Sequence, residues 1–181
     1  MKVLVVVDMQ NDFVSGVLGT EEARAIVPKV VKKIEEYEGD IAVTMDTHFP
    51  DYLETQEGKK LPVPHCIHLE HGWELVNDVF DAVDAKFSVE HPTNTFTKFT
   101  FGSTSLAVWL NEMEAKYGLE EVEFIGLCTD ICVISNVMLA KAYVPDVRIV
   151  VDASCCAGVT PDSHKTALAA MKACQVEVIN E

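Results

Sequence analysis

Short apolar runs alternate along this chain with stretches in which apolar residues recur every three or four positions. The run VLVVV at residues 3–7 is β-branched and lacks polar residues, which is typical of a parallel strand buried on both faces. Further apolar runs predict strands of the same kind at 41–45, 96–99, 122–127, 147–151 and 176–179.

The segments between these runs follow the 3.6-residue period of amphipathic helices. They predict a helix from about residue 22, a short one near 73–79, and helices at about 106–117, 130–142 and 161–173. Alternating strands and helices with short connections imply βαβ units. We therefore expect one domain over residues 1–181, a three-layer α/β/α fold around a mostly parallel, doubly wound six-stranded sheet.

Composition narrows the classes of partner. The chain has 181 residues, 49% of them hydrophobic, and a formal net charge of −15, so nucleic acid and anionic membrane surfaces would repel it. Six cysteines without framework spacing suggest reduced thiols in a cytosol. The sequence shows no signal peptide and no run near the roughly 18 apolar residues of a membrane span. We expect a soluble, cytoplasmic protein.

Side chains with catalytic chemistry follow the predicted strands or, for Lys98, lie within the strand predicted at 96–99. They are Asp8, Asp46, His48, Lys98, Cys128, Cys132 and Asp152. In a doubly wound sheet, ligands bind beyond the carboxyl ends of the strands, which meet at one edge. The sequence therefore predicts a site at this edge.

Two cysteines follow the strand at 122–127. Cys132 would lie in the first turn of the next helix, where the helix dipole favours a thiolate and free N–H groups can hold an oxyanion. Cys128, at the strand end, is better placed to offer its backbone N–H. The alternative is that both are small buried apolar residues.

A thiol nucleophile needs a base, and Asp8 at a neighbouring strand end could take the proton and later protonate a leaving amine. Lys98 could keep Asp8 ionised and stabilise a thiolate or oxyanion. Taken alone, Asp8 could equally cap a turn, and Lys98 could be a surface residue.

At this point the chain resembles the isochorismatase-like cysteine hydrolases, through VVVDMQNDF near the start, a lysine about ninety residues later, and GLCTDICV. DTH at 46–48 and VPHC at 63–66 resemble the nicotinamidase branch. The resemblance implies a catalytic triad of Asp8, Lys98 and Cys132. It also implies an oxyanion hole made by the backbone N–H groups of Cys128 and Cys132, beside a cis peptide bond between Leu127 and Cys128.

A metal site is predicted near the second strand. Asp46 and His48 are two residues apart, so an extended chain points both to one face. The third ligand could be His65, His68 or His71, and the family pattern selects His65. A carboxylate with two imidazoles suits Zn²⁺, and also Fe²⁺ or Mn²⁺. Some relatives add a carboxylate, for which the candidates are Glu54 and Glu57.

The resemblance implies hydrolysis of nicotinamide to nicotinate and ammonia through a thioester on Cys132, a reaction of NAD salvage, with the metal on the pyridine nitrogen. Phe13, Trp73 and Phe101 are candidates to stack on the ring. Alternatives are another small amide or carbamoyl substrate, or a non-catalytic binding module. The resemblance also implies a homo-oligomer. Cys155 and Cys156 are expected to be core residues.

Overall fold

The computed structural model describes residues 1–88 and 93–181, and these residues form one six-stranded sheet in which every neighbouring pair is parallel. The strands are β1 (Lys2–Val7), β2 (Asp40–Asp46), β3 (Thr93–Lys98), β4 (Glu121–Leu127), β5 (Arg148–Ala157) and β6 (Glu177–Ile179). Their order is β3-β2-β1-β4-β5-β6. The order reverses between β1 and β4, which is where doubly wound sheets bind ligands. The predicted fold class is confirmed.

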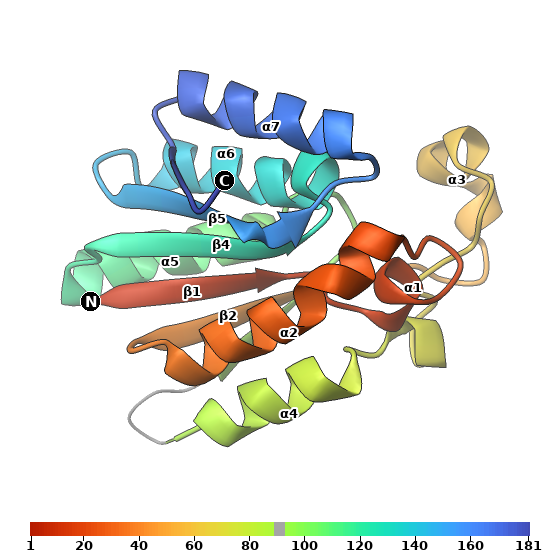
Figure 1. Cartoon of the computed structure of the whole chain (residues 1–181), viewed down its shortest axis with the longest axis horizontal. Helices are drawn as coiled ribbons and strands as arrows, with labels where there is room; N and C mark the ends of the chain where they lie inside the picture. The colour runs from red at the N-terminus through yellow and green to blue at the C-terminus, as the bar shows by residue number, and fades with distance from the viewer. Residues whose placement is uncertain (89–92) are drawn as a thin grey trace.

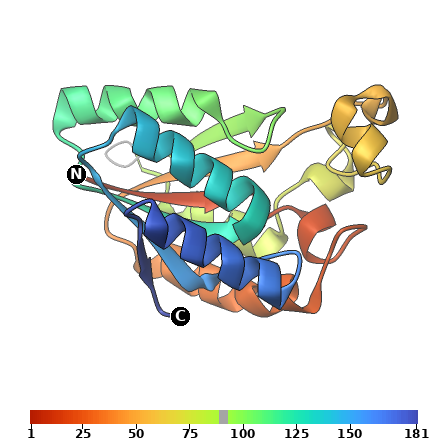
Figure 2. The ribbon, with the colours of Figure 1, turned by 90° about the horizontal axis from the view of Figure 1, so that it is seen from above.

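Helices cover both faces of the sheet. One face carries α2 (Glu21–Glu36) and α4 (Asn77–Lys86), which lie in front in Figure 1. The other carries α5 (Thr104–Tyr117), α6 (Ile134–Tyr143) and α7 (Pro161–Ala173), seen from above in Figure 2. Within residues 1–88 and 93–181, no helix has both the length and the apolar character needed to cross a bilayer.

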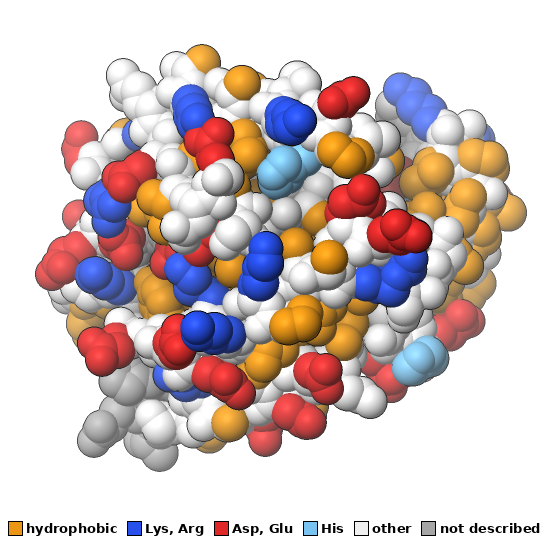
Figure 3. Space-filling view, viewed as in Figure 1, with side chains coloured by type: hydrophobic (Ala, Val, Ile, Leu, Met, Phe, Trp, Pro, Cys, Tyr) orange, Lys and Arg blue, Asp and Glu red, His pale blue; other side chains and the backbone are white. Residues whose placement is uncertain are grey.

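Short elements gather beyond the carboxyl ends of the strands (Figure 1). They are α1 (Asn11–Val14), α3 (Gln56–Lys60), the 3₁₀ turns η1 (Tyr52–Glu54) and η2 (His71–Trp73), and the π turn η3 (Thr129–Val133). On the face of Figure 3, which shows α2 and α4, acidic and basic side chains are interspersed, as expected of solvated helix surfaces.

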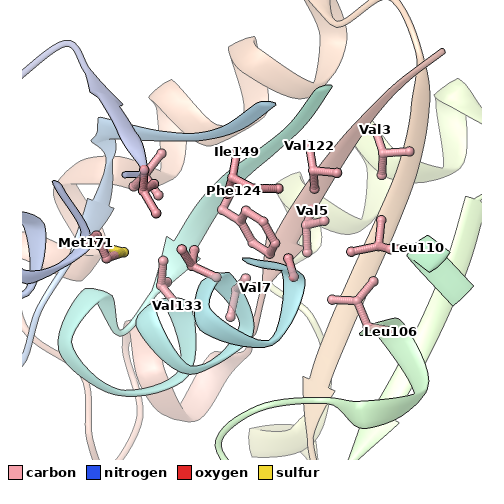
Figure 4. Close-up of a cluster of buried hydrophobic side chains, with 14 of the residues drawn as sticks. Val3, Val5, Val7, Leu106, Leu110, Val122, Phe124, Val133, Ile149 and Met171 are labelled. Atoms are coloured by element: carbon pink, nitrogen blue, oxygen red, sulfur yellow. The ribbon is translucent and has the colours of Figure 1, made fainter. Parts of the chain in front are cut away.

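The packing of the core explains why residues 3–7 of β1 are all apolar. Val3, Val5 and Val7 point into the cluster beneath α5, α6 and α7 (Figure 4), and Leu4 and Val6 point into the cluster beneath α2 and α4. All five are fully buried. Alternate side chains of a central parallel strand meet helices on opposite faces, so no polar position remains in it.

Several predicted boundaries are wrong. β3 begins at Thr93 rather than at residue 96, and α6 begins at Ile134, after the π turn η3, rather than at residue 130. The short helix expected near 73–79 is instead the 3₁₀ turn η2 followed by α4 from Asn77, because Leu75 and Val76 pair with the backbone that follows β1. The fifth strand does not stop at residue 151. It continues to Ala157 because the backbone of Cys156 and Ala157 pairs with Gly126 and Leu127 at the end of β4.

Candidate active site

A buried lysine joins the groups at the switch point. Lys98, the last residue of β3, places its Nζ 2.7 Å from Asp8 Oδ2 and 3.4 Å from Cys132 Sγ. The same Nζ lies 2.9 Å from Asp46 Oδ1. All four side chains are buried. The structure thus brings together an acid, a cation and a thiol that are far apart in the sequence.

Asp8 is held by the end of its strand. The residue has a positive φ of 48°, a conformation that Asp tolerates better than most residues, and the chain leaves the sheet there. Its Oδ1 accepts a hydrogen bond of 2.6 Å from Thr44 Oγ1 on β2. With Lys98 on Oδ2, both carboxylate oxygens have partners, so the side chain is fixed.

Cys132 lies in a turn that the surrounding structure supports. The Leu127–Cys128 peptide bond is cis, as expected. The carbonyl of Cys128 accepts hydrogen bonds from the N–H groups of Ile131 and Val133, which closes the π turn before α6. Asn136 Nδ2 donates to the carbonyl of Cys132 at 2.8 Å. Cys132 is therefore presented from a rigid element.

The protonation state of Cys132 differs from expectation. Burial raises the pKa of the thiol well above its usual value, and the nearby Asp8 carboxylate raises it further. The pKa of Asp8 is also raised by burial, although Lys98 opposes this. The predicted lowering of the thiol pKa by the helix start is therefore wrong, because loss of hydration is the larger effect. The neutral thiol is therefore favoured at rest.

A group with metal-ligand chemistry adjoins these residues. Asp46 Oδ2 lies 3.0 Å from His48 Nε2 and 3.6 Å from His65 Nε2, and the ligand atoms lie within 4.8 Å of one another. His65 Nδ1 donates to the carbonyl of Val63 at 2.8 Å, which leaves Nε2 free to accept. One carboxylate and two imidazoles fit a zinc-type divalent ion.

The structure places the other candidate ligands at different distances from the Asp46, His48 and His65 group. His68 packs against the Trp73 ring, and His71 is exposed beside Glu74. Glu57 approaches the group, with Oε1 3.6 Å from His48 Nε2. In the described chain Glu54 is not part of it.

Asp46 belongs to both groups, with one oxygen on Lys98 and the other on His48. Burial acts to raise the pKa of Asp46, but the His48 and His65 side chains beside the carboxylate outweigh this effect. The charge of Lys98 acts in the same direction, so the pKa lies well below its usual range. The carboxylate is therefore ionised.

A cavity of about 310 Å³ opens onto both groups. Cys132, Asp46 and His65 lie on it, together with Cys128 and Glu57. Its walls are otherwise mainly apolar and include Phe13, Leu18, Leu61, Phe101, Ile131 and Val159. Such walls suit a flat, apolar ring.

Two predicted residues lie elsewhere. Trp73 lines a different cavity, beside Val43, and its Nε1 donates to Thr47 Oγ1 at 2.7 Å. Asp152 lies within β5 and pairs with Lys33 at 2.7 Å, so it is not part of the site edge.

Sequence reasoning missed several residues of the site. Gln10 and Thr44 hold Asp46 and Asp8, and Leu18, Leu61, Ile131 and Val159 line the cavity. Gln10 had a local signal, since it lies two residues after Asp8 in the motif VVVDMQNDF. The wall residues had none, because apolar residues in loops occur throughout the chain.

A buried thiol with an acid and a lysine beside a cavity is the set of groups that nucleophilic catalysis by a cysteine uses. Residues 2–181 match the isochorismatase domain, and the chain belongs to this family.

Individual relatives are more specific. The chain is 27% identical over 197 residues to the nicotinamidase/pyrazinamidase of Mycobacterium tuberculosis, covering 99% of this chain and 98% of that protein. It superposes on the nicotinamidase/pyrazinamidase of Bacillus subtilis with a TM-score of 0.81 and 26% identity, covering 99% of each chain. The fold also matches a pyrazinamidase of Pyrococcus horikoshii in complex with zinc, at a TM-score of 0.75 and 22% identity over 99% of each chain.

Proposed function

We propose that this protein is a nicotinamidase, which hydrolyses nicotinamide to nicotinate and ammonia. The observation that carries the proposal is the position of Lys98, whose Nζ contacts Asp8 and Asp46 and lies 3.4 Å from the Cys132 thiol. The relatives named above support the choice of substrate.

In the first half-reaction, Cys132 Sγ attacks the amide carbon and its proton passes to Asp8. The Lys98 ammonium contacts both side chains and offsets the negative charge that moves between them. The backbone N–H groups of Cys128 and Cys132 would hold the oxyanion. Asp8 then gives the proton to the amide nitrogen, the C–N bond breaks, and ammonia leaves a thioester.

In the second half-reaction, Asp8 takes a proton from water, and the resulting hydroxide attacks the thioester carbon. The C–S bond breaks, and the proton returns from Asp8 to Cys132. The raised pKa values of both groups suit this exchange, because neither holds its charge strongly when buried.

Asp46, His48 and His65 would hold a divalent metal ion, with zinc favoured and Fe²⁺ or Mn²⁺ as alternatives. When bound, the ion supplies a Lewis acid that can orient a pyridine nitrogen and polarise water. Glu57 is the carboxylate that could complete the ligand set.

The apolar walls of the cavity favour a substrate with a flat, uncharged ring. A neutral aromatic amide meets apolar walls, with Phe13 and Phe101 as candidates to contact the ring.

The test is ammonia release from nicotinamide by metal-reconstituted protein, with pyrazinamide and small aliphatic amides and carbamoyl compounds in parallel. Turnover of nicotinamide with a clear preference over the aliphatic compounds is the expected result. Preference for a carbamoyl compound would keep the reaction type and reject the substrate. No hydrolysis of any of these compounds by metal-loaded protein would reject the proposal.

A further inference from the structure

The side chain of Gln10 is completely buried and holds the backbone of Asp46. Its Oε1 accepts a hydrogen bond of 2.7 Å from the Asp46 N–H, and its Nε2 donates one of 2.8 Å to the Asp46 carbonyl. Nε2 also donates to the carbonyl of Trp73 at 2.7 Å. Gln10 therefore binds both the donor and the acceptor of one peptide residue and ties them to a second segment.

This contact replaces a missing piece of strand. β1 pairs with β2 as far as Val7 opposite Thr44, and the chain then turns away at Asp8. β2 continues to Asp46, so its backbone extends beyond the end of β1. A carboxamide offers the same donor and acceptor as a peptide group. The Gln10 side chain thus pairs with Asp46 where a longer β1 would have done so.

The partners of Gln10 allow one orientation of its amide. The Asp46 N–H needs an acceptor, and the carbonyls of Asp46 and Trp73 need donors. Exchanging the amide oxygen and nitrogen would set donor against donor and acceptor against acceptor, a costly arrangement when buried. The backbone of Asp46 is consequently held in one position.

That position matters because the two oxygens of the Asp46 carboxylate contact different groups. Its Oδ1 lies 2.9 Å from Lys98 Nζ and its Oδ2 lies 3.0 Å from His48 Nε2. A small rotation or shift would lengthen one contact or both. A carboxylate shared in this way depends on a fixed backbone.

We propose that Gln10 is a positioning residue, which fixes Asp46 so that one oxygen stays on Lys98 while the other stays available to a divalent metal ion. The inference rests on the metal site of the proposed function. It assigns to Gln10 an effect on metal affinity that a residue needed only for folding would not have.

The experiment measures Zn²⁺ and Co²⁺ affinity of the full chain by calorimetry with a competing chelator, well below the unfolding temperature. Gln10→Met keeps the side-chain length but removes the three hydrogen bonds, and Gln10→Glu keeps an acceptor but loses the amide donors. Loss of a group that orients a metal ligand typically weakens metal binding by about 10–100-fold. We expect both variants to fall in this range.

Two controls separate positioning from folding. Asn136→Asp makes the same amide-to-acid change at an equally buried residue, whose side chain contacts Ser103, Phe101 and Cys132 rather than Asp46. Ile34→Ala truncates the core beneath α2, and its loss of stability provides a reference for Gln10→Met. Metal affinity should stay close to wild type in both controls.

The outcomes are distinct. Wild-type affinity in a folded Gln10→Met or Gln10→Glu variant would overturn the inference. An equal loss in Ile34→Ala would also overturn it, because destabilisation would then be the cause. If wild-type protein binds neither ion, the proposed metal site is wrong and the role of Gln10 falls with it. If wild type binds metal but releases no ammonia, only the proposed substrate fails.

Discussion

Two lysines in this fold each lie between two carboxylates, yet only one belongs to a site. Lys98 contacts Asp8 and Asp46, and Lys33 on α2 contacts Asp152 at 2.7 Å and Glu123 at 2.8 Å. The ion pairs alone do not distinguish them.

The surroundings of Lys33 and Lys98 distinguish the two lysines. The carboxylate of Asp152 is also bonded by Ser154 Oγ at 2.7 Å and by Asn180 Nδ2 at 3.0 Å. Lys33 thereby ties α2 to β4, β5 and the end of the chain. Lys98 instead has a thiol at 3.4 Å and contacts an acid that lines an apolar cavity. A buried ion pair indicates chemistry when a nucleophile and a space for substrate adjoin it.

The largest expected effect comes from removing the thiol. Cys132→Ala should lower kcat by about a thousandfold or more, because no covalent intermediate can form. Cys128→Ala keeps its backbone N–H and should retain turnover within about tenfold of wild type. Ammonia release measures both. Full activity of Cys132→Ala would exclude it as the nucleophile.

Replacing each lysine compares the two ion-pair clusters directly. Lys98→Met should lower kcat/KM by about 100-fold or more, because Asp8 and Cys132 lose their counter-charge. Lys33→Met should keep activity. It should lose only about 1–3 kcal/mol of stability, because Lys33 is partly exposed and solvent screens its ion pairs. Urea unfolding and kinetics of both variants are the measurements. The reverse pattern would contradict the assignment of the clusters.

Metal affinity should distinguish His65, a proposed ligand, from the exposed His71. His65→Asn removes a proposed ligand and should weaken Zn²⁺ binding by about 100-fold. His71→Asn alters an exposed residue and should leave metal affinity unchanged. Competition with a chelator measures both affinities. Equal affinity in the two variants would place the metal elsewhere.

The smallest effect is the acid dependence of stability. The pKa of Asp152 is lowered from 3.8, since hydrogen bonds from Lys33, Ser154 and Asn180 outweigh burial. The unfolded chain then binds more protons, so this stabilisation is present above pH 3.8 and is lost as the pH falls toward the folded-state pKa. The stability difference between wild type and Asp152→Asn should shrink with acidification.

The contribution of Asp8 to stability depends on pH in the opposite direction. Burial raises its pKa, so its stabilising contribution is present at low pH and is lost as the pH rises through the folded-state value. The stability of wild type relative to Asp8→Asn should therefore improve with acidification. Urea unfolding between about pH 3 and 6 measures both differences, and parallel trends would contradict the assigned pKa directions.

The sequence predicted the site residues that stand at strand ends. Asp8, Asp46, Lys98 and Cys128 each end or follow an apolar run, and parallel strands bring such positions to one edge. It failed for Asp152, because small residues after position 151 continue β5 rather than end it. It failed for Trp73, because the backbone pairing of residues 75 and 76 turns this segment toward another cavity.

By itself, then, the sequence determined the alternation of strands and helices, the edge at which ligands bind, and the ordered motifs of the isochorismatase family. The first two follow from local periodicity and from the geometry of parallel sheets, and the motifs are known from their resemblance to the family. Tertiary structure alone decided that Lys98 also contacts Asp46 of the metal-type group, that Gln10 holds Asp46, and that burial raises the pKa of Cys132. Distances between remote segments and loss of hydration depend on the packed fold, which no local pattern encodes.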